Sequence, residues 1–206
     1  MPFVVDNPGT GSSVQKFSTD VAWTTPGNIV GNDTNYASVD LTTTNSESEY
    51  LVATNFGFDI SQLADLEGMI VEVDRISDQD RSIQDDAIQI WKSGTVDGTN
   101  ESIGTYWTNS WTTDYFGSAS DKWGILGGEN AAYVNASDFG VAFRCQFGDV
   151  YASLVTAQIR RVEVTIYYSI GDVLHYTTKL AGVYHGTNSI KAIYHGSTKI
   201  AAYNDP

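Results

Sequence analysis

Residues 139–147, FGVAFRCQF, alternate large apolar side chains with small or polar ones. The apolar set is Phe139, Val141, Phe143, Cys145 and Phe147, and the other set is Gly140, Ala142, Arg144 and Gln146. Successive side chains of an extended strand point to opposite faces, so this period of two predicts a β-strand with one buried face.

The same alternation recurs along the chain. It is found in residues 68–76 (GMIVEVDRI), 86–92 (DAIQIWK) and 161–168 (RVEVTIYY), and residues 50–58 (YLVATNFGF) also favour a strand. Turn-forming Gly, Asn, Asp and Pro separate these segments at 26–28, 31–33, 97–100 and 127–128. We find no amphipathic helix, only short helical turns expected at 63–66 and 135–138. Half-buried strands with such turns predict an all-β fold, an antiparallel jelly-roll-like β-sandwich over residues 19–170.

The charge and the cysteine count limit the partners. The 206 residues hold 11 Lys and Arg against 25 Asp and Glu, a formal net charge of −14. Nucleic acid and anionic membrane surfaces need clustered cations, so neither is expected as a partner. Cys145 is the single cysteine, which excludes an internal disulfide, and its place in the alternation predicts a buried thiol. We see no signal peptide or membrane span, so we expect synthesis and assembly in a cytoplasm.

A repeat of ten residues fills the C-terminal segment, 171–206. The copies are VLHYTTKLAG at 173–182, VYHGTNSIKA at 183–192 and IYHGSTKIAA at 193–202, and all three histidines (His175, His185 and His195) occupy one repeat position. Gly186 and Gly196 favour turns, followed by short strands near 179–184, 189–194 and 199–203 that would form a small β-meander.

Alternation places one set of side chains on a common face of this meander: Leu180, Tyr184, Ile190, Tyr194 and Ile200. Three strands this short are marginal alone. We therefore predict that the face, with the turn residues His185, Gly186, His195 and Gly196, is a docking interface. Its partner would be the sandwich, a second subunit or another protein of an assembly.

The sequence contains little that points to a catalytic site or a metal site. Residues 1–172 contain no histidine, which argues against a Ser-His-Asp triad, and no acidic pair is marked by its context as a glycosidase centre. The acids Asp78, Asp80, Asp85 and Asp86 leave structural calcium as an alternative to an ordinary polar loop, and the repeat histidines leave metal binding around a symmetry axis as an alternative to turn residues. We expect no enzyme activity, no cofactor and no metal.

The aromatic stretch at 106–116 is the best candidate for ligand binding. It offers Tyr106, Trp107, Trp111 and Tyr115 beside Thr, Asn and Asp side chains. Flat aromatic faces with a few fixed polar partners suit sugar rings. The alternative is that these rings fill the core or a contact between subunits.

Several short motifs occur in a recognisable order. They are Trp23; Ile83 and Asp85 as Ile-x-Asp; Asp121, Trp123 and Gly124 as Asp-x-Trp-Gly; Asn135, Phe139, Gly140 and Val141; and the closing strand VEVTIYY. Over about residues 20–168 the chain resembles a β-sandwich domain recurrent in bacteriophage structural proteins. Phe116-Gly117-Ser118 departs from that domain's Tyr-Gly-Gly turn. The C-terminal repeat resembles the tails of many virion proteins, although Tyr176 and Thr177 break the pattern in its first copy.

The resemblance implies a non-enzymatic phage virion structural protein: a capsid decoration, head fibre or tail appendage. Its partners would be other virion proteins and further copies of itself, with a trimer as one arrangement that hides edge strands. It would be assembled in the host cytoplasm and carried on the virion. Residues 1–18 would form an N-terminal arm or a first strand. The alternative function is a receptor-binding or carbohydrate-binding module of a tail fibre that recognises a host surface glycan.

Overall fold

The computed structural model describes residues 1–170, apart from 32, 45, 126–129 and 149–152, and the backbone of 184–185, 188–189, 192–195 and 198–202. Its contacts divide the chain into two units, Met1–Gly171 and Asp172–Pro206. Among the described residues, no helix is long and apolar enough to cross a membrane.

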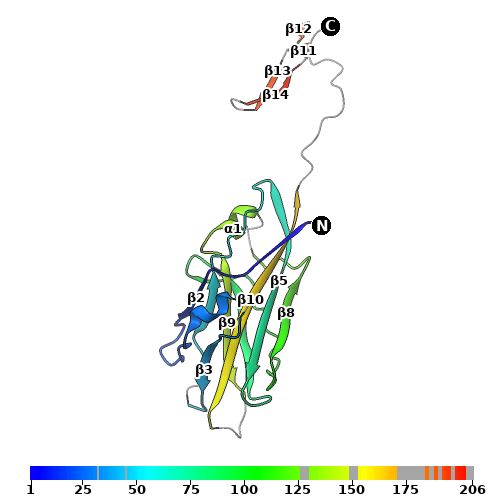
Figure 1. Ribbon diagram of the computed structural model, residues 1–206. Coiled ribbons are helices and arrows are strands. Elements are labelled where there is room, and N and C mark those ends of the chain that lie inside the picture. Colours follow the sequence, from blue (N-terminus) through cyan, green and yellow to red (C-terminus); the bar gives the residue numbers. More distant parts are fainter. Residues whose placement is uncertain are drawn as a thin grey trace. The chain divides into compact units, whose positions relative to one another are not determined.

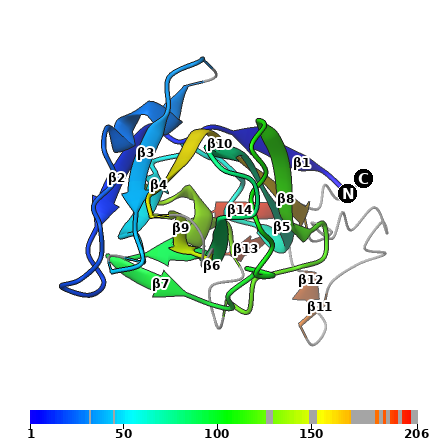
Figure 2. The same cartoon turned by 90° about the horizontal axis from the view of Figure 1, so that it is seen from below.

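The first unit is an antiparallel β-sandwich, as the alternation predicts. The first sheet (sheet A) has the order β1-β10-β5-β8, with β3 also paired to β10, and the second (sheet B) has the order β2-β4-β9-β6-β7. Sheet A consists of β1 (Phe3–Asp6), β3 (Ala37–Leu41), β5 (Ala64–Ser77), β8 (Thr112–Ser118) and β10 (Val155–Ile170). Sheet B consists of β2 (Thr10–Val14), β4 (Tyr50–Thr54), β6 (Ile83–Lys92), β7 (Thr95–Asp97) and β9 (Gly140–Phe147). Figure 1 shows the long strands β5, β8 and β10 side by side, and Figure 2 shows the two layers from below.

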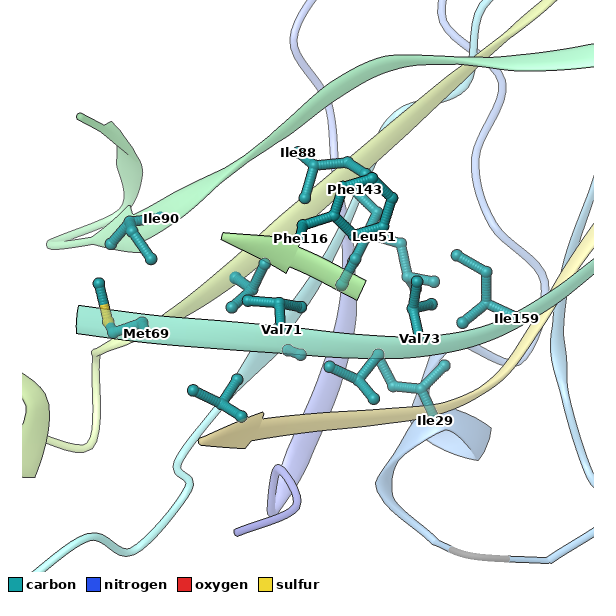
Figure 3. Packing of buried hydrophobic residues seen from close by; sticks show 14 of the residues in the cluster. Ile29, Leu51, Met69, Val71, Val73, Ile88, Ile90, Phe116, Phe143 and Ile159 are labelled. Carbon is teal, nitrogen blue, oxygen red and sulfur yellow. The ribbon is translucent and has the colours of Figure 1, made fainter. Parts of the chain in front are cut away.

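The core lies between the two sheets. Figure 3 shows Val71 and Val73 of β5, Ile88 and Ile90 of β6 and Phe143 of β9 within one cluster. These side chains belong to the apolar sets that the alternation placed on one face, so those strands are confirmed. Cys145 is buried, and burial raises the pKa of its thiol to about 12. The expected core thiol is confirmed, and its chemistry is that of a protonated, unreactive group.

Register shifts in the strand pairing change which side chains face the core. The register of β10 with β5 shifts between Ile159 and Arg161, and that of β6 with β9 shifts between Asp85 and Ala87. Consequently Ile159 and Val162 are both buried although two residues separate them. A bulge of this kind turns two consecutive side chains toward the same face.

The Asp-x-Trp-Gly motif forms a buried corner. Asp121 Oδ1 accepts a hydrogen bond from the Trp123 backbone N–H (2.8 Å), and Trp123 Nε1 donates to the Met69 carbonyl (3.1 Å). Trp123 is fully buried with a φ of 55°. Gly98, with a φ of 70°, approaches so closely that a Cβ there would lie 2.1 Å from the Trp123 carbonyl oxygen. The motif therefore serves to pack this corner of the sandwich.

Two sequence expectations differ from the structure, and a third, left open by the sequence, takes one of its two forms. The helical turn expected at 63–66 is wrong, because β5 begins at Ala64 and pairs there with Ile170. The helix near 135–138 lies earlier, as α1 (Ala131–Asn135), and a 3-10 helix, η1 (Pro26–Val30), was not anticipated. Residues 1–18, for which an arm or a first strand was left open, supply β1 to sheet A and β2 to sheet B.

The second unit contains two short antiparallel pairs. Strand β11 (Tyr184–His185) pairs with β12 (Asn188–Ser189), and β13 (Ala192–His195) pairs with β14 (Thr198–Ala202). Among the described residues the two pairs form separate two-stranded sheets rather than one meander. Four predicted interface residues, Leu180, Gly186, Ile190 and Gly196, lie outside the described residues, as does His175.

Candidate functional site

Strand β8 and the residue before it carry aromatic rings on the outer face of sheet A. The burial of β8 alternates, with Thr113 and Tyr115 exposed and Phe116 in the core. Trp111 lies an even number of residues from Thr113 and Tyr115, so it faces the same side. It is half-buried, and Tyr115 is 64% exposed. With a rise of about 3.3 Å per residue, the two ring-bearing positions lie about 13 Å apart along the chain.

On the outer face of sheet A, Trp111 contacts one residue of β10 and one residue next to β3. The guanidinium carbon of Arg160 lies 4.4 Å from the centroid of its ring, and the Tyr36 ring centroid lies 6.3 Å away at an interplanar angle of 47°. Tyr36, which immediately precedes β3, is 40% exposed. The outer face therefore gathers aromatic and cationic groups that are far apart in the sequence.

Asp74 of β5 provides the polar centre of this face. Its carboxylate accepts a hydrogen bond from the Thr113 hydroxyl through Oδ1, and Oδ2 lies 3.4 Å from Arg160 Nε and 3.5 Å from Arg161 Nε. Arg161 also forms an ion pair with Glu72. We call this set the Trp111 surface; it comprises Tyr36, Glu72, Asp74, Trp111, Thr113, Tyr115, Arg160 and Arg161.

Trp107, predicted as part of the sugar platform, lies inside the sandwich and is only 4% exposed. Its Nε1 donates a hydrogen bond to Asp85 Oδ1 (2.9 Å), and the Arg75 guanidinium carbon lies 4.8 Å from its ring centroid. The prediction for Trp107 is therefore wrong: its ring packs against a buried ion pair and is closed to a ligand.

Tyr106 is 38% exposed but lies apart from this face. It forms a β-bridge with Gln84 of sheet B, and its hydroxyl donates to the Gly148 carbonyl (3.4 Å). Of the four predicted aromatics, only Trp111 and Tyr115 share one outer face.

The buried network under β8 fixes the loop that leads to Trp111. Arg75 forms an ion pair with Asp85 and donates from Nε to Asp114 Oδ2 (2.7 Å). Burial raises the pKa of Asp85 above its ordinary value even though Arg75 acts to lower it. Backbone hydrogen bonds from Trp107 N–H to the Ile83 carbonyl (2.8 Å) and from Ser77 N–H to the Thr108 carbonyl (2.9 Å) hold the same loop. Trp111 thus projects from an anchored segment.

A second aromatic pair lies on the outer face of sheet B. The ring centroids of Tyr50 and Trp91 are 6.2 Å apart, but the residues are only 4% and 9% exposed. Partly buried Val14 and Val96 pack against them, and Lys16 Nζ lies 5.4 Å from the Tyr50 ring centroid. This pair stabilises a covered satellite cluster, so it does not offer an open ring to a ligand.

The acids of the 78–86 loop face different partners. Asp78 Oδ1 accepts from the Thr156 N–H (2.9 Å), Asp85 points at Arg75, and Asp86 forms an ion pair with Arg144. Within the described part of the chain, no three His, Cys, Asp or Glu residues gather in a way that could hold a metal ion.

Comparison with known proteins gives distant structural likenesses. No protein-family model matches the chain, and no curated protein matches its sequence. One similar structure is the N-terminal cellulose-binding domain of β-1,4-glucanase C from Cellulomonas fimi, with 12% identity, a TM-score of 0.39, and coverage of 77% of this chain and 90% of that chain.

A putative sugar-binding protein from Bacteroides thetaiotaomicron has 8% identity and a TM-score of 0.41, covering 79% and 86% of the two chains. A Stig cyclase from Fischerella has 10% identity and a TM-score of 0.42, covering 80% and 83%. At TM-scores this low, the likenesses carry no argument about function.

Sequence reasoning missed Tyr36, Asp74 and Arg160. Tyr36 and Arg160 are 124 positions apart in the sequence (160 minus 36). Both lie beside Trp111 because β3 pairs with β10. One signal for Arg160 was present: the apolar alternation 155-157-159 changes to 162-164-166, which places two arginines between buried positions.

Proposed function

We propose that the protein is a non-catalytic carbohydrate-binding module that holds an oligosaccharide on the Trp111 surface. The observation that carries this proposal is the outer face of sheet A, where the exposed Tyr36 and Tyr115 and the half-buried Trp111 lie with Thr113, Arg160 and the largely buried carboxylate of Asp74. Aromatic rings provide apolar platforms for the C–H faces of sugars, and fixed polar groups bind their hydroxyls.

The spacing of Trp111 and Tyr115 along the strand indicates the length of the ligand. Trp111 and Tyr115 are separated by about 13 Å of extended strand, which is more than one sugar ring spans. An oligosaccharide lying along β8 would contact both rings, whereas a monosaccharide would contact one.

Replacing Trp111 with alanine should weaken glycan binding at least tenfold, which corresponds to about 1.4 kcal/mol, because the sugar loses a stacking partner. Titration calorimetry with a ligand identified on a glycan array would measure the change. Tyr106→Ala is the control, since it removes an exposed aromatic ring that lies apart from the Trp111 surface. Equal binding by wild type and Trp111→Ala would contradict the proposal.

A second candidate function concerns the C-terminal unit. We infer that residues 172–206 attach the sandwich to an assembly, in keeping with the resemblance to phage virion proteins. The observation that favours it is a ten-residue repeat that forms separate short strand pairs in its own unit, β11 with β12 and β13 with β14. Such short hairpins need a packing partner to persist.

Ending the chain after Ile170 tests this attachment role. We expect the shortened protein to keep the thermal transition and glycan binding of the sandwich but to lose self-association and incorporation into particles, measured by sedimentation and by copy number in purified virions. Unchanged oligomeric state and incorporation would contradict the attachment role.

A further inference from the structure

We infer that Arg160 binds a carboxylate on the ligand, so that the Trp111 surface selects acidic oligosaccharides. This inference rests on the proposed carbohydrate-binding function. It assigns the chemical class of the ligand, a sugar chain that carries uronic or similar acid groups, and it names the residue that selects it.

The arginines of the sandwich differ in how fully their charges are paired. Arg75 binds Asp85 and Asp114; Arg144 binds Asp20, Glu47 and Asp86; and Arg161 binds Glu72, with Asp74 and Glu163 within 3.5 and 3.6 Å. Arg160 has one contact, from Nε to Asp74 Oδ2 at 3.4 Å. Its terminal Nη groups form no hydrogen bond or ion pair with the described residues.

Asp74 pairs with Arg160 through Nε only, which leaves the Nη end of the guanidinium without a partner among the described residues. The same carboxylate accepts the Thr113 hydrogen bond and faces Arg161, and its contact with Arg160 is at the long end of hydrogen-bonding distance. The Arg160 side chain is also 31% exposed. A guanidinium in this state keeps the N–H donors of both Nη groups for a planar, bidentate acceptor, which is the geometry of a carboxylate.

The β10 bulge lets Arg160 and Arg161 lie together on this face. Without the register shift between Ile159 and Arg161, a strict alternation would send Arg160 and Arg161 to opposite faces. With it, both contact Asp74 on the outer face while Ile159 and Val162 remain in the core. Bulges recur where a strand must re-aim a side chain at a binding site.

Trp111 then holds the guanidinium in place. The 4.4 Å separation of Arg160 Cζ from the Trp111 ring centroid is a cation–π contact, which restrains the flexible side chain before any ligand arrives. A restrained guanidinium loses less conformational entropy on binding a ligand than a freely rotating one. Selection therefore comes from local geometry, because a chain with a net charge of −14 does not attract anions at long range.

The test compares acidic oligosaccharides (uronate-containing and sialylated) with the same oligosaccharides after reduction of their carboxyl groups to alcohols. We expect the wild type to bind the acidic forms at least tenfold more tightly than the reduced forms, measured by titration calorimetry. Arg160→Gln should remove this preference, and Arg160→Lys should keep part of it.

Arg81→Gln is the matched control. Arg81 is also exposed and lies over a ring, that of Tyr106, and its loss changes the net charge by the same amount. If wild type binds acidic and reduced forms equally while Trp111→Ala abolishes both, carbohydrate binding stands and the role of Arg160 is overturned. If no oligosaccharide of either kind binds, the proposed function and this inference both fail.

Discussion

Replacing Trp123 with alanine should lower the free energy of unfolding by about 3–5 kcal/mol, because it empties a fully buried site that cannot collapse. The indole fills the corner beside Gly117, where a Cβ would lie 2.5 Å from its Nε1, and it bonds to the Met69 carbonyl. Chemical denaturation followed by circular dichroism would measure the loss.

Trp111→Ala provides the matched comparison for Trp123→Ala. It removes the same side chain from a half-buried outer position, so we expect a loss of about 1 kcal/mol or less. Similar losses in the two variants would show that Trp123 does not form the packed corner described for the Asp-x-Trp-Gly motif.

Replacing Asp85 with alanine should cost about 3–5 kcal/mol, because it leaves the buried Arg75 guanidinium without its main partner. The side chains of Arg75 and Asp85 are 3% and 2% exposed, and Trp107 also loses its acceptor. In a double-mutant cycle, Arg75→Ala with Asp85→Ala should cost much less than the sum of the single changes.

An exposed ion pair gives the control for this cycle. Lys92 and Asp138 have side chains that are 17% and 49% exposed, so Asp138→Ala should cost about 1 kcal/mol or less. Additive losses for Arg75 and Asp85 would contradict a coupled buried pair.

The Asp85 carboxyl also makes the stability of the folded protein depend on pH. Its pKa is raised by burial, so the native protein binds this proton more tightly than the unfolded chain does. Its contribution to stability is therefore greatest below the ordinary pKa and declines as the pH rises through the raised native value.

Alternation was sufficient to predict most of the sandwich. It located β4, β5, β6, β9 and β10, each of which turns a row of apolar side chains into the core, although β4 and β9 are also covered on their outer faces. It could not locate β1 or β2, whose residues are exposed or half-buried, as expected of strands at the edges of their sheets. Strand pairing is non-local, so the order of the sheets could not be derived from local patterns.

The candidate site was predictable only in part. Tyr106 and Trp107 are neighbours in an extended segment, where consecutive side chains point to opposite sides, and the sequence does not say which side is the core. The answer depends on Asp85 and Arg75, which supply a buried acceptor and a cation for Trp107. Trp111 and Tyr115 lie four positions apart and share the outer face, but the residues beside them come from β5, β10 and the residue before β3, which no local pattern brings together.

The most direct test of the carbohydrate-binding proposal is an NMR titration of the five tryptophan indole N–H signals with an oligosaccharide selected on a glycan array. We predict a saturating shift for Trp111, with the signals of Trp23, Trp107 and Trp123 unmoved, because their Nε1 groups are hydrogen-bonded inside the sandwich. A shift confined to Trp91, or a bound ligand that leaves Trp111 unchanged, would contradict the account.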